Sequence, residues 1–151
     1  MEDLRLTSPA FDHGERIPEK YGYTAENTNP PLDVGGVPDE AVSLVLVVDD
    51  PDAKDPADKV WDHWVVWNVP AAQTHIPEDW SPDEAIEGQN DYGEVGWGGP
   101  NPPDREHTYR FVVYALDTTL DLPAGASKDD VYYAASGHTL AKGELTGTYP
   151  A

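Results

Sequence analysis

Three apolar segments separated by long loops constrain the fold of this chain most strongly. Ser43–Val48 (SLVLVV) is apolar at every position after the serine, which is typical of a central strand covered on both faces. Val60–Val69 and Tyr109–Leu116 are rich in aromatic and β-branched residues and are bounded by Pro, Gly or Asp. We therefore expect these three segments to form the middle of a β-sheet.

The rest of the chain predicts many turns and little helix. The connections 49–59, 70–88 and 93–106 are rich in Pro, Gly and Asp, and loops of this length are usually functional. One helix is indicated where Ser127 precedes Asp130 in an S-x-x-D capping box. Short strands, long loops and little helix favour a mainly β protein, an antiparallel β-sandwich with peripheral helix.

The charge of the chain excludes several classes of partner. With 29 Asp and Glu against 9 Lys and Arg, the formal net charge is −20. A polyanion lacks the cations that displace counterions from nucleic acid or from anionic membranes, so neither is an expected partner. Molar salt screens such self-repulsion within about 3 Å, and we therefore expect a halophilic source.

Length and residue usage indicate one domain in a reducing compartment. A chain of 151 residues suits a single domain over residues 1–151 with a sizeable core. The chain has no cysteine, which excludes disulfides and thiolate metal sites. The N-terminal residues show no basic region followed by an apolar stretch, so we expect no signal peptide, no integral membrane association and a cytoplasmic location.

Two histidines and two aspartates lie at the ends of the predicted strands. His63 shares an alternating, largely aromatic face with Trp61, Val65 and Trp67, and His107 begins the third strand beside Tyr109. Each histidine taken alone is more often a structural residue than part of a site. Asp50 and Asp52 follow the buried first strand, where a solvated turn is the plain interpretation. Strand ends converge in a sandwich, however, so we expect these side chains to meet.

A glycine- and proline-rich loop, GWGGPNPP at residues 96–103, is the other candidate for binding. It places bare backbone N–H groups where a ligand could approach, and its prolines limit its motion. It lacks the spacing and the lysine of a phosphate-binding P-loop, so a stiff structural loop explains it as well. The signatures G-x-S-x-G, H-E-x-x-H and G-x-G-x-x-G after a strand are also absent.

The order of motifs resembles the phosphatidylethanolamine-binding protein family, in its bacterial and archaeal Raf kinase inhibitor-like branch. The resemblance spans nearly the whole chain, through LTSPAFDHGERIPEKYGYTAENTNPPL, SLVLVVDDPDA, HWVVWNVPA, GQNDYGEVGWGGPNPP, HTYRFVVYALD and GHTLAKGELTGTY. It implies a large antiparallel sheet packed on a smaller one, with one or two helices. It also implies a small surface pocket for phosphate, phosphorylethanolamine or similar anions.

The resemblance assigns the pocket to residues that match two family motifs, D-P-D-A-P and G-P-x-P-P followed by H-R-Y. The family's pocket histidine, which follows the start of the next strand, matches His63. The ligand-binding residues implied by the resemblance are Asp50, Asp52, His63, Gly99, Pro100, Pro102, His107 and Tyr109. Lys54 replaces the last proline of the first motif and Thr108 replaces the arginine of the second. The chain also ends soon after Tyr149, without the C-terminal helix of eukaryotic members, which predicts an open pocket.

We expect a non-enzymatic binding or regulatory protein that takes a small phosphate-containing or other anionic ligand, without a metal or cofactor. If His63 and His107 donate as cations, affinity for the anion should weaken as the pH rises through about 6.5. One alternative is an inhibitor of a protein kinase or serine protease, a function of the wider family. The other is a hydrolase that uses His63, His107 and Asp50 as a metal site or as acid and base.

Overall fold

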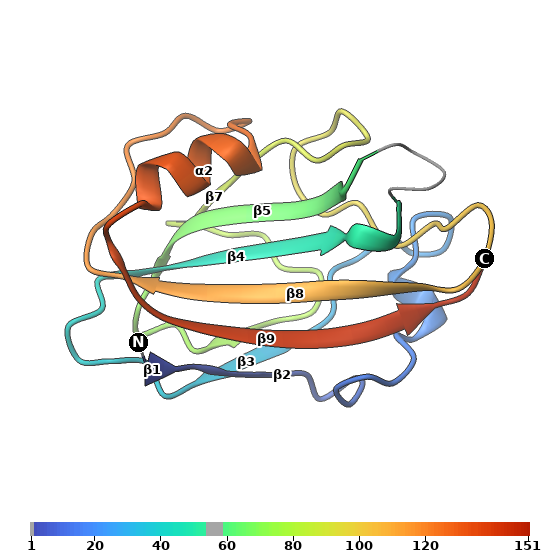
Figure 1. Cartoon of the computed structure of the whole chain (residues 1–151), viewed down its shortest axis with the longest axis horizontal. Coiled ribbons are helices and arrows are strands. Elements are labelled where there is room, and N and C mark those ends of the chain that lie inside the picture. The colour runs from blue at the N-terminus through green and yellow to red at the C-terminus, as the bar shows by residue number, and fades with distance from the viewer. Residues whose placement is uncertain (1, 54–58) are drawn as a thin grey trace.

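The computed structural model describes residues 2–53 and 59–151, and these form a sandwich of two β-sheets (Figure 1). The large sheet has the strand order β1-β9-β8-β4-β5-β7 and the small sheet has the order β2-β3-β6. Within the described residues, every neighbouring pair is antiparallel except β1 with β9. The expected architecture, a large sheet packed on a smaller one, is confirmed.

The elements of the described chain are mostly strands. The strands are β1 (Glu2–Asp3), β2 (Arg5–Thr7), β3 (Leu32–Gly35), β4 (Ser43–Asp50), β5 (Trp61–Pro70), β6 (His75–Ile76), β7 (Ile86–Glu87), β8 (His107–Leu116) and β9 (Thr139–Tyr149). The helical elements are the 3₁₀ turns η1 (Glu19–Tyr21) and η2 (Pro51–Ala53) and the α-helix α2 (Lys128–Ala135).

Strand β4 lies at the centre of the large sheet, between β8 and β5, as its sequence predicts. All eight of its residues are buried. Leu46 and Val48 pack toward the small sheet, whereas Val45 and Val47 pack toward α2. Because each face covers a separate core, the strand is apolar at consecutive positions instead of alternating, and each buried aliphatic side chain stabilises the fold by about 1.5–3 kcal/mol.

The long strand β9 was not predicted, because glycines occupy two of its inward positions. Gly143 and Gly147 face the N-terminal segment, where a Cβ would lie 2.6 Å from the Leu4 carbonyl oxygen and 2.7 Å from Ile17 Cγ1. These contacts require residues without a side chain. Because glycines occupy these inward positions, the segment lacks the alternating apolar side chains from which a strand is normally predicted.

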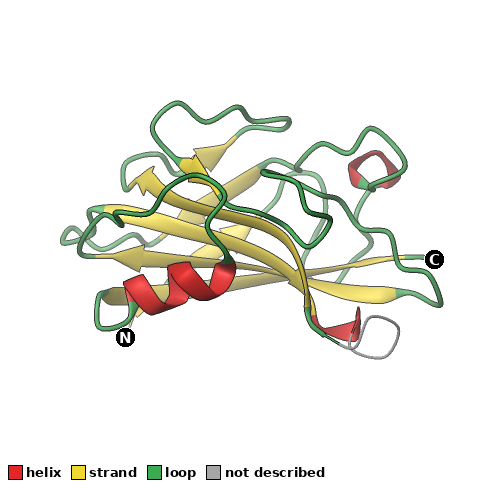
Figure 2. Ribbon diagram, turned by 90° about the horizontal axis from the view of Figure 1, so that it is seen from above, coloured by secondary structure: helices red, strands yellow, loops and turns green. Residues whose placement is uncertain are grey.

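Helix α2 begins with the predicted capping box. The Asp130 backbone N–H donates to Ser127 Oγ at 3.1 Å, and the Ser127 N–H donates back to Asp130 Oδ2 at 3.2 Å. Val131 and Ala135 bury the inner face of the helix on the large sheet, opposite the small one (Figure 2). The cap and these two residues fix where the helix begins and which face it buries.

A largely buried ion network ties α2 to the large sheet. Lys128 Nζ lies 2.6 Å from Asp62 Oδ1 on β5 and 3.4 Å from Asp49 Oδ2 on β4. Arg110 on β8 holds the same Asp49 with two hydrogen bonds, of 2.8 and 3.0 Å. Two of the chain's nine basic residues thus neutralise carboxylates that the fold buries.

We predict that Lys128→Met lowers the free energy of unfolding by about 3 kcal/mol, because it removes the cation paired with Asp62 and leaves Asp49 with Arg110. The matched control is Lys20→Met, whose ion pair with Glu78 is exposed and should contribute less than about 1 kcal/mol. Denaturant unfolding at fixed salt measures both variants. Equal losses for the two would contradict a structural role for the Lys128 network.

Candidate functional site

A bulge in β5 places His63 in the site. The residues on either side of His63 pair with consecutive residues of β4, which makes His63 the extra residue. Beyond the bulge, Asp62 faces α2, and His63 and Trp61 line a pocket on the opposite side. Val65 and Trp67 still pack toward α2. The expectation that His63 shares one face with Val65 and Trp67 is therefore wrong, because the extra residue shifts the alternation.

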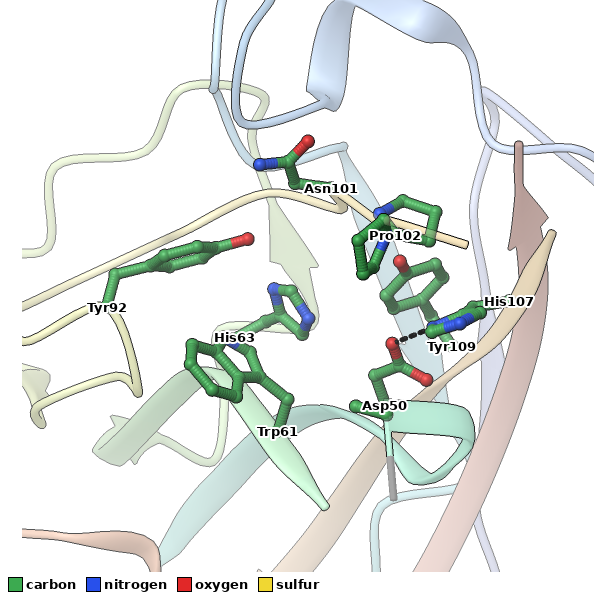
Figure 3. A pocket seen from close by; sticks show the side chains of 10 residues that line it. Asp50, Trp61, His63, Tyr92, Asn101, Pro102, His107 and Tyr109 are labelled. Carbon is green, nitrogen blue, oxygen red and sulfur yellow. Dashed lines mark hydrogen bonds and ion pairs between the residues drawn. The ribbon is translucent and has the colours of Figure 1, made fainter. Parts of the chain in front are cut away.

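The ends of β4, β5 and β8 meet two loops around a pocket of about 170 Å³ (Figure 3). Its lining residues are Asp50, Ala53, Trp61, His63, Tyr92, Asn101, Pro102, Pro103, His107 and Tyr109. Rings and prolines supply most of the surface, with a few polar groups among them. The volume is below the roughly 300–1,000 Å³ of pockets for drug-sized ligands, so it suits a small molecule or a head group.

Five of the predicted site residues line this pocket, namely Asp50, His63, Pro102, His107 and Tyr109. Asp52 does not line the pocket, but it holds Asp50 and the start of β8 in place through two hydrogen bonds. Its backbone N–H donates to Asp50 Oδ1 at 2.9 Å, and its carboxylate accepts from the Thr108 N–H at 2.9 Å.

Gly99 and Pro100 also lie outside the lining, and they hold the loop in place. The Gly99 N–H donates to Asn27 Oδ1 at 2.7 Å, and the Pro100 carbonyl accepts from the Tyr23 N–H at 2.9 Å. A Cβ at Gly99 would collide with the Tyr21 carbonyl. This glycine is therefore required for close backbone packing.

Of the two departures from the family motifs, Thr108 lies within the described residues and Lys54 does not. The Thr108 side chain is exposed, and it lies next to but not among the pocket residues, as the alternation of the strand predicts. Lys54 lies outside the described residues, as do Asp55 and Asp58, which the sequence assigns to a solvated turn.

Sequence reasoning missed the aromatic side of the pocket. Tyr92 stacks on Tyr23 with ring centroids 3.9 Å apart and meets Trp61 edge-on at 5.6 Å and His63 at 5.7 Å. Its hydroxyl donates to the Gly99 carbonyl at 2.9 Å. The signal was an aromatic residue inside GQNDYGEVGWGGPNPP, but no spacing rule connects it to a strand 30 residues earlier.

His107 is held between two carboxylates. Its Nδ1 lies 2.6 Å from Asp50 Oδ2, and its Nε2 lies 2.8 Å from Asp104 Oδ1. Carboxylates accept hydrogen bonds, so both ring nitrogens donate only in the imidazolium form. Burial opposes this charge, but the bonds to Asp50 and Asp104 raise the pKa of His107 above 6.5. The stability that this gives is present below pH 6.5 and is lost as the pH rises through the folded pKa.

His63 has the opposite protonation state. Its Nδ1 lies 2.6 Å from the Gly98 carbonyl oxygen, which accepts only, so Nδ1 carries the ring proton. Burial lowers the pKa of His63 to about 4. The ring is therefore neutral near pH 7, and its Nε2 is an acceptor. The condition that both histidines donate as cations is not met by His63, because no carboxylate bonds to its ring and the charges of Asp49 and Asp91 raise its pKa less than burial lowers it.

Two donors in the pocket have no partner. The Tyr109 hydroxyl and the Trp61 indole N–H are buried and complete no hydrogen bond of normal geometry within the described part of the chain, although Asp50 and the Asn101 backbone lie near the Tyr109 hydroxyl. Burial raises the pKa of Tyr109, which keeps its hydroxyl protonated. Buried polar groups without partners are rare in native proteins and call for an explanation. A ligand with acceptor atoms would satisfy both donors.

Residues 2–53 and 59–151 contain neither a metal-binding cluster nor a membrane-spanning helix. No group of three or more His, Asp or Glu side chains there has an arrangement that would hold a metal ion. None of the helices in the same residues is long and apolar enough to cross a membrane.

The two packed sheets and the small pocket at the strand ends define a class of β-sandwich protein, and similarity to known proteins identifies the family. The phosphatidylethanolamine-binding protein family model matches residues 7–150. The chain belongs to the phosphatidylethanolamine-binding protein family.

Relatives and solved structures support this assignment over the full length. A UPF0098 protein of Methanothermobacter thermautotrophicus is 46% identical over 151 residues, covering 97% of this chain and 98% of the relative. The crystal structure of a phosphatidylethanolamine-binding protein homologue from Chlamydia trachomatis has a TM-score of 0.91 at 40% identity, covering 99% and 98% of the two chains. Escherichia coli YbcL has a TM-score of 0.90 at 33% identity, covering 99% of each chain.

We predict that the contribution of His63 to stability is lost in acid. Its folded pKa of about 4 lies below the unfolded value of 6.5, so the unfolded chain binds more protons between these two values. The shift corresponds to roughly 3 kcal/mol of stability, present above pH 6.5 and lost as the pH falls toward 4.

Denaturant unfolding of wild type and His63→Gln across this pH range gives the measurement. The difference between the two proteins cancels the titration of the surface carboxylates. A difference in the free energy of unfolding that stays constant with pH would show that His63 titrates normally.

Proposed function

We propose that this protein is a non-enzymatic binding or regulatory protein whose pocket holds a small phosphate-type anion, such as phosphate or a phosphorylated head group. The observation that carries the proposal is the buried, unpartnered Tyr109 hydroxyl in a pocket of about 170 Å³. Trp61 also lines the pocket, and its buried indole N–H is a second donor without a partner in the described residues. Anion oxygens accept the hydrogen bonds that these two groups offer.

The electrostatics of the pocket support a weakly charged anion. The imidazolium of His107 lines the pocket, and it is the positive charge among the described lining residues. Its charge is shared with Asp50 and Asp104, so it orients the site without creating a strongly positive one. Hydrogen bonds at short range, not the field of a −20 chain, would then select the ligand.

The histidines argue against hydrolysis. Both nitrogens of His107 are engaged by carboxylates, which leaves no free lone pair for a general base. His63 has a lone pair on Nε2, but a pKa of about 4 makes it a weak base near neutral pH. A binding role is consistent with both rings in these protonation states.

Inhibition of a protein kinase or serine protease, a cytoplasmic location and a halophilic source remain predictions.

We predict that Tyr109→Phe weakens the binding of inorganic phosphate about tenfold, because one hydrogen bond to a charged acceptor is lost. Isothermal titration calorimetry at fixed KCl measures the dissociation constant. The matched control is Tyr133→Phe, which removes the same hydroxyl from a side chain that is 87% exposed and should leave the affinity unchanged. Unchanged affinity in Tyr109→Phe would contradict the proposed binding mode.

A further inference from the structure

The pocket offers acceptors as well as donors, and the first acceptor is His63. The Gly98 carbonyl fixes the ring proton on Nδ1, so the lone pair remains on Nε2. The ring lines the pocket with only 2% of its surface exposed. The backbone of the same two residues is also joined, because the Gly98 N–H donates to the His63 carbonyl at 2.9 Å. The tautomer is thus built into the contact between β5 and the loop.

Asp50 is the second acceptor in the pocket. Its side chain is 4% exposed, and its two oxygens accept from the Asp52 N–H and from His107 Nδ1. Each carboxylate oxygen carries two lone pairs, so acceptor capacity remains after these bonds. A ligand that reaches both His63 and Asp50 meets lone pairs, not protons.

The net charge around the pocket is negative. Asp50, Asp52 and Asp104 carry three negative charges, against two positive charges on His107 and Arg105. Arg105 lies 3.9 Å from both Asp52 and Asp104. These five groups sum to −1, which disfavours a dianion more than a monoanion.

From these three observations we propose that the pocket selects anions that carry their own proton, and binds the monoanion of a phosphate monoester in preference to sulfate, sulfate esters or phosphate diesters. This inference rests on the proposed function. The P–OH group donates to His63 Nε2 or Asp50, and the other oxygens accept from Tyr109 and Trp61. A sulfate ester has acceptors alone, so its oxygens would face the lone pairs of His63 and Asp50.

The pH dependence of this selection comes mainly from the ligand. The titratable and charged groups in or near the pocket are Asp49 and Asp50 on β4, Asp52 on η2, His63 on β5, Asp91, Tyr92, Asp104 and Arg105 on the loops, and His107 and Tyr109 on β8. Of the two histidines, His63 stays neutral above pH 5 and His107 has a raised pKa. The second ionisation of a phosphate monoester, near pH 6, then falls inside the accessible range.

The test is a calorimetric series with methyl phosphate, dimethyl phosphate and methyl sulfate at about pH 5 and about pH 7, in the same KCl concentration. The protonated fraction of methyl phosphate falls about tenfold between these two pH values, and its affinity should fall by the same factor. At the lower pH the diester and the sulfate ester should bind at least about tenfold more weakly than methyl phosphate, with little pH dependence.

The outcomes separate the inference from the proposed function. Methyl sulfate that binds as tightly as methyl phosphate, or methyl phosphate that binds more tightly at the higher pH, overturns the selection while anion binding stands. Failure of all three ligands to bind overturns both.

Two variants identify the groups responsible. His63→Phe removes the acceptor and keeps a buried ring, so the ratio of methyl phosphate to methyl sulfate affinity should collapse toward one. Tyr109→Phe should weaken both ligands and leave their ratio intact. The ligand series on the wild-type protein stands as the test even if His63→Phe does not fold, and circular dichroism checks its folding.

Discussion

The contact between His63 and Gly98 is the interaction on which the site depends. Two hydrogen bonds join these residues, one from the Gly98 N–H to the His63 carbonyl and one from the His63 ring to the Gly98 carbonyl. The first fixes the glycine- and proline-rich loop to the bulge in β5. The second fixes the ring proton of a buried histidine. Loop position and pocket chemistry therefore follow from a single contact.

The neighbouring histidine shows how its partners decide the chemistry of an imidazole. His107 has two carboxylates and is a cation, and His63 has a carbonyl and is neutral. With the free hydroxyl of Tyr109, the pocket presents both donors and acceptors in a small, mostly apolar space. The −20 charge of the chain acts at longer range, where salt screens it, and leaves this local pattern unaffected.

Local sequence patterns predicted the central strands β4, β5 and β8 and the cap of α2, because burial on two faces and capping chemistry act within a few residues. They also predicted that Asp50, His63 and His107 would meet at the strand ends. The strand β9 was missed because the glycines at its inward positions are required by close contacts with the N-terminal segment, which is distant in the sequence.

The bulge at His63 and the position of Tyr92 were missed for a related reason. A bulge depends on the register against β4, and Tyr92 reaches the pocket through its contacts with Tyr23 and the loop. Both are long-range properties that no short window of sequence contains. The same bulge decides which face His63 joins, so the chemistry of the site needed the structure.

The central claim is that one histidine of the pocket accepts hydrogen bonds and the other is a cation. Long-range ¹H–¹⁵N NMR spectra of the imidazole rings near pH 6 test it most directly, because they distinguish protonated from unprotonated ring nitrogens. We expect His63 to show a protonated Nδ1 and an unprotonated Nε2, and His107 to show two protonated nitrogens. A doubly protonated His63, or a His63 protonated on Nε2 alone, would contradict the account.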